Sequence, residues 1–278
     1  MIIESIPQIV SRVILAKLQK TLVFETLFNE DYSGDVASGN SVAVVGIDSA
    51  TVKPYTRNNP ITYETIEDEA LELPIDQEYY YAVRVDDLDK VQSNPDLLAA
   101  VALDAVYQVA AHIDKDLGEV LDAGAEIDVM GSDETPVQLT SSNILQVMAR
   151  ISRLLDEANV PRGGRGIVLP PWGVEKLVLA GADIKTENAA AFDNGWIGRV
   201  SGLDVRMSTA CPSVSDATSV LAGSNIGATL AMQVQKTEAL RLQGYFADAV
   251  RGLICYGRVI TRPATIARLV CVEGEEAE

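Results

Sequence analysis

One long helical pattern constrains the fold of this chain more than any other feature of its sequence. Asn94, Pro95 and Asp96 are residue types typical of a helix N-cap, first position and first turn. The pattern ends at Gly124, and at ~1.5 Å per residue it predicts a helix roughly 40 Å long. In a chain of 278 residues, we expect such a helix to be a spine along which other elements pack. Its apolar residues recur at spacings of three and four: Leu98, Val101, Ala105, Val109, Ile113, Leu117 and Val120.

Before this helix, residues 40–87 have the pattern of short strands separated by turns. Tyr79 and Tyr81 alternate with Tyr80 and Ala82, a period of two that predicts a strand with two different faces. The preceding segment IEDEALELPIDQE is acidic and has few apolar side chains. A hairpin of this composition is too polar to build a core of its own, so we expect it to lie on another surface.

The N-terminal segment, residues 7–28, has the pattern of an amphipathic helix. Its apolar stripe consists of Ile9, Val10, Val13, Ile14, Leu18 and Leu22. This segment and the polar hairpin are therefore two arms that do not bury their surfaces within one subunit. Such arms are typical of a protein that assembles with copies of itself.

The remaining sequence predicts a mixture of helices and strands. A helix is expected from Ser141 or Ser142 to about Ala158, and the apolar segment RGIVLPP after it is expected to be a buried strand. Residues 219–232 have the pattern of a strand, a turn and a helix. Two long apolar strands then meet at Pro263.

Charge and cysteine content exclude several classes of protein. The formal net charge is −18, and a chain this acidic does not gather nucleic acid by bulk electrostatics, which needs clustered Lys and Arg. Cys211, Cys255 and Cys271 form no CxxC motif, so we expect neither a disulfide framework nor a zinc site, and we expect Cys255 and Cys271 to be core residues. No apolar run reaches the ~18 residues of a membrane helix, and no membrane contact is expected.

The loop NVPRGGRG is rich in glycine and arginine, like many phosphate-binding loops. The chain has no Gly-Lys pair for a P-loop, and Leu169 stands where a dinucleotide fingerprint needs its third glycine. The loop also follows a helix and precedes a strand, whereas phosphate sites use a helix N-terminus. We interpret it as a tight reversal in which Pro161 helps to end the helix.

The sequence contains no complete catalytic or metal-binding motif. His112 is the single histidine, and no nucleophile elbow accompanies it. The segment NEDYSG resembles the start of a calcium loop, but Asn40 replaces the final Glu, which favours an Asx turn. Asp114 and Asp116 fit a solvated helix face better than a carboxylate pair for glycoside hydrolysis. We predict no catalytic, cofactor-binding or metal-binding residue; an acidic carboxylate- or metal-dependent enzyme is the alternative from another class.

Five segments occur in an order that is itself informative: LFNEDYSGDVASGNSVAVVGI, LPIDQEYYYAVRVDDLDKVQSNPDLL, NVPRGGRGIVLPPWGVEKLV, GRVSGLDVRMSTA and DAVRGLICYGRVITRP. In this order they resemble the major capsid (coat) proteins of tailed phages, which have the Hong Kong 97-like capsid fold. The resemblance covers nearly the whole chain. Each segment is a hydrophobic pattern with a few polar anchors, and the five together carry the resemblance.

The resemblance implies an α+β fold in four parts. These are an N-terminal arm (1–38), an extended loop hairpin (39–78), a peripheral domain with the spine helix (79–140 and 250–278) and an axial domain (141–249). The arm and the extended loop would reach neighbouring subunits. The candidate inter-subunit contacts are then Lys53, Tyr55 and Arg57 in the loop, with Arg162 and Arg165 facing an adjacent axial domain.

The implied function is self-assembly, as pentamers and hexamers, into an icosahedral shell that encloses double-stranded DNA without sequence-specific binding. The implied partners are further copies of the chain, a scaffolding protein, a portal and decoration proteins, with assembly in the host cytoplasm and a final place in the virion capsid. No cofactor and no enzymatic activity are expected. The alternative most similar to this function is an encapsulin-type nanocompartment shell, which has the same fold.

Overall fold

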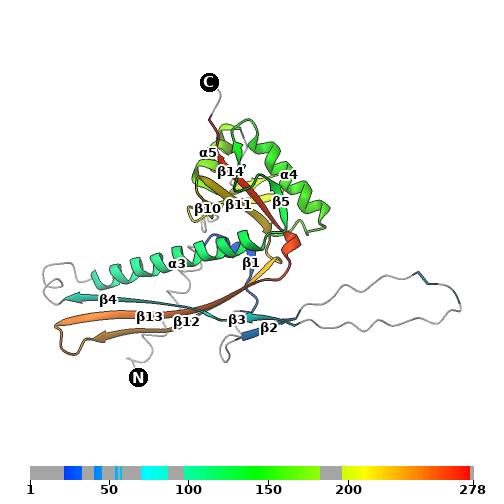
Figure 1. The fold of residues 1–278 in the computed structure, drawn as a ribbon. Helices are drawn as coiled ribbons and strands as arrows, with labels where there is room; N and C mark the ends of the chain where they lie inside the picture. Colours follow the sequence, from blue (N-terminus) through cyan, green and yellow to red (C-terminus); the bar gives the residue numbers. More distant parts are fainter. Residues whose placement is uncertain are drawn as a thin grey trace.

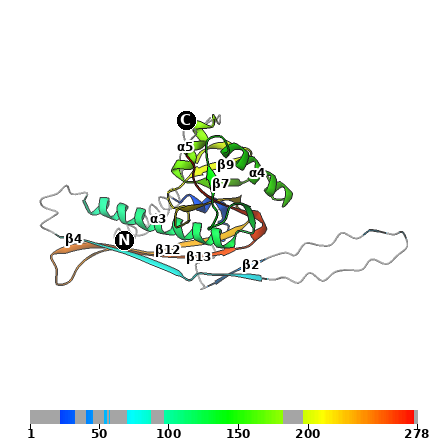
Figure 2. The ribbon, with the colours of Figure 1, turned by 45° about the horizontal axis from the view of Figure 1, so that its top comes forward.

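The computed structural model describes residues 22–32, 41–45, 54, 55, 57, 70–86, 97–181 and 196–275. They form two layers, which Figure 1 shows one above the other. The lower layer is a long helix on an extended sheet, and the upper layer is a compact lobe of strands and shorter helices. A two-stranded hairpin leaves the lower layer in the direction opposite to the free end of its long strands (Figures 1 and 2).

The lower layer, here called the spine layer, contains helix α3 (Leu97–Gly124) on a four-stranded sheet with the order β1–β12–β13–β4. The predicted spine helix is confirmed, and its predicted cap at Asn94 lies outside the described residues. The buried stripe of the helix consists of Val106, Ala110, Ile113, Leu117 and Leu121. The strands are β1 (Phe28–Asn29), β12 (Ala228–Arg241), β13 (Ala247–Ile260) and β4 (Gln77–Asp86).

Strand β4 shows how one face of this sheet is buried. Tyr81 lies in the same core cluster as Ile113 of α3, whereas the adjacent Tyr80 is 78% exposed on the other face. Residue 252, opposite Tyr81 on β13, is a glycine, and a Cβ there would lie 2.4 Å from the tyrosine ring. The predicted alternation along β4 is therefore confirmed, and Gly252 makes room for its largest inward side chain.

The upper layer, here called the compact lobe, is built on a second sheet with the order β5–β14–β11–β7–β9–β8. All five residues of the central strand β7 are buried, as its apolar sequence predicts. The described helices and strands of the compact lobe are β5 (Ile127–Met130), β6 (Val137–Leu139), α4 (Ile144–Glu157), β7 (Arg165–Leu169), α5 (Pro171–Leu179), β8 (Trp196–Val200), β9 (Leu203–Met207), β10 (Ser213–Val214), β11 (Ala217–Ser224), η4 (Pro263–Thr265) and β14 (Ile266–Glu273).

Helix α4 presents the apolar face that the sequence predicts. Ile144, Val147, Met148, Ile151 and Leu155 are buried in the core of the compact lobe. The N-cap position is Asn143 rather than Ser141 or Ser142, because those serines lie in the preceding turn. The Asn143 side chain stabilises this turn by accepting a hydrogen bond from the Thr140 amide at 2.9 Å.

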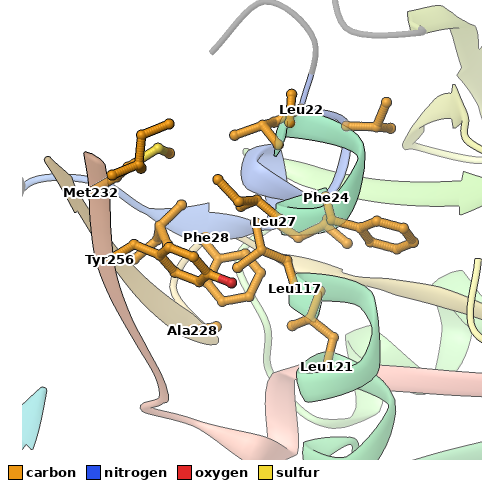
Figure 3. Packing of buried hydrophobic residues seen from close by; sticks show 14 of the residues in the cluster. Leu22, Phe24, Leu27, Phe28, Leu117, Leu121, Ala228, Met232 and Tyr256 are labelled. Atoms are coloured by element: carbon orange, nitrogen blue, oxygen red, sulfur yellow. The ribbon is translucent and has the colours of Figure 1, made fainter. Parts of the chain in front are cut away.

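The N-terminal segment enters the spine layer at Leu22. The short 3-10 helix η1 (Phe24–Leu27) is followed by β1, which pairs in parallel with the start of β12. Figure 3 shows Phe24 near Leu117, and Phe28 near Tyr256. The prediction of an α-helix over residues 7–28 is therefore wrong at its C-terminal end, because the chain must turn to pack against both α3 and the sheet. Residues 7–21 lie outside the described residues.

The base of the extended hairpin is the antiparallel pair β2 (Ser41–Val45) and β3 (Ala70–Pro74). The hairpin base crosses β13 closely, because a Cβ at Gly257 would lie 2.2 Å from the Pro74 carbonyl oxygen. Leu73 of β3 is fully buried in a small cluster with Ala231 of β12. The hairpin therefore lies on the spine layer at its base, as expected for a segment without a core of its own.

Two strands differ from the sequence-based expectation. Residues 228–241 form strand β12 instead of the helix predicted at the end of 219–232, because they pair with β13 along its length. This places β12 in the spine layer, although it falls within the range 141–249 expected for the axial domain. Conversely, β14 lies between β5 and β11 in the compact lobe, although it falls within 250–278, expected to be peripheral.

Candidate assembly surface

A buried carboxylate joins the root of the N-terminal segment to both layers. Asp114 of α3 is 4% exposed, and its Oδ1 accepts hydrogen bonds from the amides of Val23 (2.7 Å) and Phe24 (2.8 Å). Its Oδ2 accepts a hydrogen bond at 2.9 Å from the hydroxyl of Ser208, which follows β9 in the compact lobe. Burial raises the pKa of Asp114, and the three donors oppose this rise.

A second buried carboxyl group lies next to this junction. Glu25 of η1 is 3% exposed. Burial, together with the neighbouring carboxylates of Glu30 and Asp114 and a side-chain hydrogen bond to Glu30, raises the pKa of Glu25 to about 9. Glu25 is therefore neutral at pH 7, and a proton is held at the arm root where the N-terminal segment meets the spine helix.

Asp116, two residues further along α3, connects the helix to the sheet. Its carboxylate accepts hydrogen bonds from the Tyr256 hydroxyl (2.9 Å) and from Nη2 of Arg258 (2.8 Å), both on β13. Burial, followed by the bond to Asp116, raises the pKa of Tyr256, so this hydroxyl stays a donor. The prediction that Asp114 and Asp116 lie on a solvated helix face is wrong, because donors from other elements bind both carboxylates.

Asp122, near the end of α3, connects the helix to the compact lobe. Arg268 of β14 donates from Nε to Asp122 and from Nη2 to Asp133, each at 2.7 Å. The two acidic partners raise the pKa of Arg268 against the effect of its burial. Charge-assisted bonds of this kind set the orientation of the lobe on the spine layer.

The glycine- and arginine-rich loop is a tight reversal, as predicted. Asn159 and Gly164 both have positive φ, of 56° and 71°. Arg165 is 2% exposed, donates to the carbonyls of Val160 and Pro161 after the end of α4, and pairs with Asp156 at 2.8 Å. The expectation that Arg165 contacts a neighbouring subunit is wrong, because its guanidinium is buried against its own chain.

The other candidate contact residues have different surroundings. Arg162 is an exposed side chain that pairs with Asp156 at 2.9 Å, a surface ion pair of small energetic value. Arg162 and Arg165 lower the pKa of Asp156. Tyr55 is 72% exposed and Arg57 is also exposed, while Lys53 lies outside the described residues. Arg162, Tyr55 and Arg57 remain candidates for contacts between copies.

The free end of the β12–β13 hairpin carries an apolar surface that the sequence analysis missed. Phe246 is 82% exposed, and the Arg84 guanidinium lies 5.2 Å from the ring centre of the exposed Tyr245. The sequence feature that could have predicted this surface is the dipeptide Tyr-Phe directly after Gly244, whose φ of 87° marks a turn. Turns normally carry polar residues, so adjacent exposed aromatic residues here indicate a contact surface.

The motifs considered for chemistry have structural roles. His112 is exposed, and its ring packs edge-on against Tyr79 with 4.5 Å between the ring centres. The Asn29 side chain accepts a hydrogen bond from the Asp31 amide at 3.0 Å, which confirms the predicted Asx turn. Within the described ranges, no group of three or more metal-ligating side chains is assembled and no helix is long and apolar enough to cross a membrane.

The cysteines are free thiols in apolar surroundings. Cys255 and Cys271 are buried core residues, as predicted, whereas Cys211 is only half-buried. Burial raises the pKa values of Cys211 and Cys271 to about 12. These two thiols are therefore protonated and unreactive at neutral pH.

The fold of this chain is similar to those of solved structures of phage capsids and of an encapsulin. No family model matches the sequence, and no curated protein matches it. A solved structure from Mycobacterium phage Che8 is 27% identical, with a TM-score of 0.71 over 90% of this chain and 91% of that one. The capsid of Ralstonia phage GP4 is 12% identical, with a TM-score of 0.72 over 93% of both chains. An encapsulin from Synechococcus elongatus is 12% identical, with a TM-score of 0.59 over 87% of this chain and 86% of that one.

These similarities first define a class: the chain has the α+β fold of shell-forming capsid proteins, and the predicted Hong Kong 97-like fold is confirmed. Within this class, the structures from phages Che8 and GP4, with TM-scores of 0.71 and 0.72, are more similar to this chain than the encapsulin is, with a TM-score of 0.59. The predicted resemblance to the major capsid proteins of tailed phages is therefore confirmed. These structural neighbours are shell proteins rather than enzymes.

Proposed function

We propose that this protein is the major capsid protein of a tailed phage, which assembles with copies of itself into an icosahedral shell around double-stranded DNA. The observation that carries the proposal is the match to the phage Che8 protein, which has 27% identity over 90% of this chain. The similarity covers both layers rather than a single motif, so it supports the function of the whole chain.

The shape of the subunit supports assembly from many copies. Hairpins extend from both ends of the spine layer (Figure 1), and neither end is covered by the compact lobe. Contacts made by such projections join unlike surfaces, and heterologous contacts of this kind form closed rings when the rotation between copies closes. We assign the compact lobe to the axial domain around five- and six-fold axes, and the spine layer to the peripheral domain.

Other partners follow from the same proposal. A scaffolding protein, a portal and decoration proteins would contact the shell, which would be assembled in the host cytoplasm. The net charge of −18 disfavours tight binding to DNA. We therefore expect packaged DNA to be enclosed without sequence-specific contacts. Tight, salt-sensitive DNA binding by the purified protein would contradict this part of the proposal.

The proposal is tested by producing the full chain, alone and with a candidate scaffolding protein, and measuring the product by sedimentation and electron microscopy. We expect closed shells, or capsomers of five and six subunits. A compact monomer that persists under all conditions and turns over a small substrate would instead support the enzyme alternative.

The encapsulin alternative is distinguished by the contents of the shell. Shells isolated from phage-infected cells would contain double-stranded DNA if the protein is a phage capsid protein. A shell that retains a cargo enzyme and no DNA would show that the chain is a nanocompartment protein.

A further inference from the structure

The root of the N-terminal segment is a small structural unit, here called the arm root and defined as residues 22–29. It contains η1 and β1. Strand β1 pairs with β12 at only two positions, and η1 packs against α3, β7 and β11. A unit with so few backbone pairings is of the kind that opens while the rest of a protein stays folded. The buried apolar side chains of the arm root are Leu22, Val23, Phe24, Leu27 and Phe28.

Glu25 places a carboxyl group inside this apolar unit without a cation beside it. The side chain is 3% exposed. Among the described residues, no Lys or Arg forms an ion pair with Glu25. A buried carboxylate without a cation is strongly disfavoured, so the group keeps its proton.

The charged groups that face Glu25 are themselves acidic. Glu30, an exposed residue directly after β1, forms a side-chain hydrogen bond with Glu25, and Asp114 faces it from α3. Burial is the largest cause of the raised pKa of Glu25, about 9, and the charges of Glu30 and Asp114 add to it. The Cys211 thiol near Asp114 has a pKa raised to about 12, so it stays neutral over the same range.

The cations on the neighbouring elements are held elsewhere. Lys115 of α3 pairs with Glu119 on the exposed side of the helix. Arg165 at the start of β7 binds Asp156 and a carbonyl of the loop after α4. Strand β11 carries no charged side chain. None of these elements therefore compensates a negative charge on Glu25.

Asp114 holds the arm root through the two residues that directly precede Glu25. Its Oδ1 accepts hydrogen bonds from the amides of Val23 and Phe24. With Glu25 protonated, the charge of Asp114 serves these donors alone. An ionised Glu25 adds a second negative charge to the same buried junction, where the low dielectric strengthens the repulsion between the two carboxylates.

We propose that Glu25 is a proton-dependent latch for the arm root. With the carboxyl group protonated, residues 22–29 stay packed on α3 and the sheet. Transfer of this proton to water favours an open state, in which the arm root leaves the core while the rest of the subunit stays folded. This latch is a property of the single subunit and does not depend on the proposed function.

The direction of the pH dependence follows from proton binding. In the open state Glu25 is hydrated and has its ordinary pKa of 4.5, whereas in the closed state its pKa is about 9. Between these values the closed state holds a proton that the open state lacks. The ratio of open to closed arm roots should therefore rise about tenfold for each pH unit in this range, which includes neutral pH.

Hydrogen exchange of the backbone amides in the full chain, followed by mass spectrometry between about pH 6 and pH 8, tests the latch. Hydroxide alone accelerates amide exchange about tenfold per pH unit, so exchange of residues 22–29 should accelerate about a hundredfold per pH unit. At about pH 8 the arm root should exchange at least tenfold faster than the buried residues of α4, because it opens locally.

Three variants make this test specific. Glu25→Gln keeps the shape of the side chain without its ionisation, so its arm root should accelerate only about tenfold per pH unit. Glu30→Gln lowers the pKa of Glu25, so the steep dependence should level off at a lower pH than in the wild type. Asp104→Asn removes an equal charge at an exposed position of α3 and should behave like the wild type.

Two results would overturn the latch. One is a steep pH dependence of exchange that persists unchanged in Glu25→Gln. The other is equal exchange of the arm root and of α4 in the wild type, because the whole subunit would then open together. Either result leaves the proposed capsid function intact, since that function is tested by the formation of shells.

Discussion

The backbone amide of Phe24 donates a 2.8 Å hydrogen bond to the carboxylate of Asp114, a residue 90 positions further along the chain. This contact and the parallel bond from Val23 hold the root of the N-terminal arm on the spine helix. The Ser208 hydroxyl binds the other oxygen of the same carboxylate. One side chain therefore determines how the arm, the helix and the compact lobe meet.

Replacing Asp114 by alanine should destabilise the subunit by on the order of 3 kcal/mol, because the buried amides of Val23 and Phe24 lose their acceptor. Denaturant unfolding of the unassembled subunit measures this loss. Asp104→Ala, at an exposed position of the same helix, is the matched control and should change stability little. Equal stability of the two variants would show that the Asp114 junction is unimportant.

Glu25 should make the stability of the subunit sensitive to alkaline pH. Its pKa is raised from 4.5 to about 9 in the folded state, so the folded chain binds the proton more tightly than the unfolded chain does. Stability is therefore lost as the pH rises from about 4.5 towards 9. Glu25→Gln mimics the protonated form and should remove much of this loss.

Thermal unfolding of the wild type and of Glu25→Gln across that pH range tests whether the stability of the subunit falls as the pH rises. The melting temperature of the variant should fall less between pH 5 and about pH 9, and the variant should be the more stable protein at the alkaline end. Parallel curves for the two proteins would mean that Glu25 keeps an ordinary carboxyl pKa.

The ion pair between Arg258 and Asp116 should be a measurable connection between β13 and α3. Arg258→Met leaves the partly buried carboxylate of Asp116 with the Tyr256 hydroxyl as its remaining short contact. This substitution should lower the free energy of unfolding by about 2 kcal/mol. Asp116→Asn should cost less in the Arg258→Met background than in the wild type. A double-mutant cycle of unfolding free energies measures this coupling, and strictly additive effects would argue against the contact.

Gly252 should tolerate no side chain while Tyr81 is present. A Cβ there would lie 2.4 Å from the tyrosine ring, so Gly252→Ala should cost about 2 kcal/mol of unfolding free energy. Gly163→Ala is the control, since no atom lies within 4 Å of the added carbon. Tyr81→Val removes the ring, so in that background Gly252→Ala should cost less unfolding free energy than in the wild type. An unchanged cost would contradict the proposed clash.

Local patterns in the sequence predicted those parts of the fold that depend on local spacing. The spine helix follows from the recurrence of apolar residues around Ile113 and Leu117, and β4 follows from its alternation. Strand β12 was missed because short apolar segments suit a helix or a strand equally, and its partner β13 decides between them. The assignment of β14 to the compact lobe likewise depends on pairing with β11, which is distant in the chain.

The candidate contacts were harder to predict, because a charged residue does not reveal its partner. Arg165 looked available in the sequence, yet carbonyls of its own loop bind it. Asp114 lies directly after Ile113 and three residues before Leu117, so its place beside the buried stripe was a usable signal of burial. The donors that satisfy it come from segments about 90 residues away on either side, which no local pattern indicates.

Truncation at two positions should separate assembly by the N-terminal arm from its role in folding. Deleting residues 1–21 leaves Leu22, Phe24, Leu27 and Phe28 in the core, so we expect stable subunits that assemble poorly. Deleting residues 1–28 also removes these four buried side chains and should unfold or aggregate the subunit. Circular dichroism and thermal unfolding report on folding, and sedimentation reports on assembly.

Normal shells from the chain without residues 1–21 would show that this segment is not needed for assembly. A well-folded chain without residues 1–28 would contradict the packing in Figure 3.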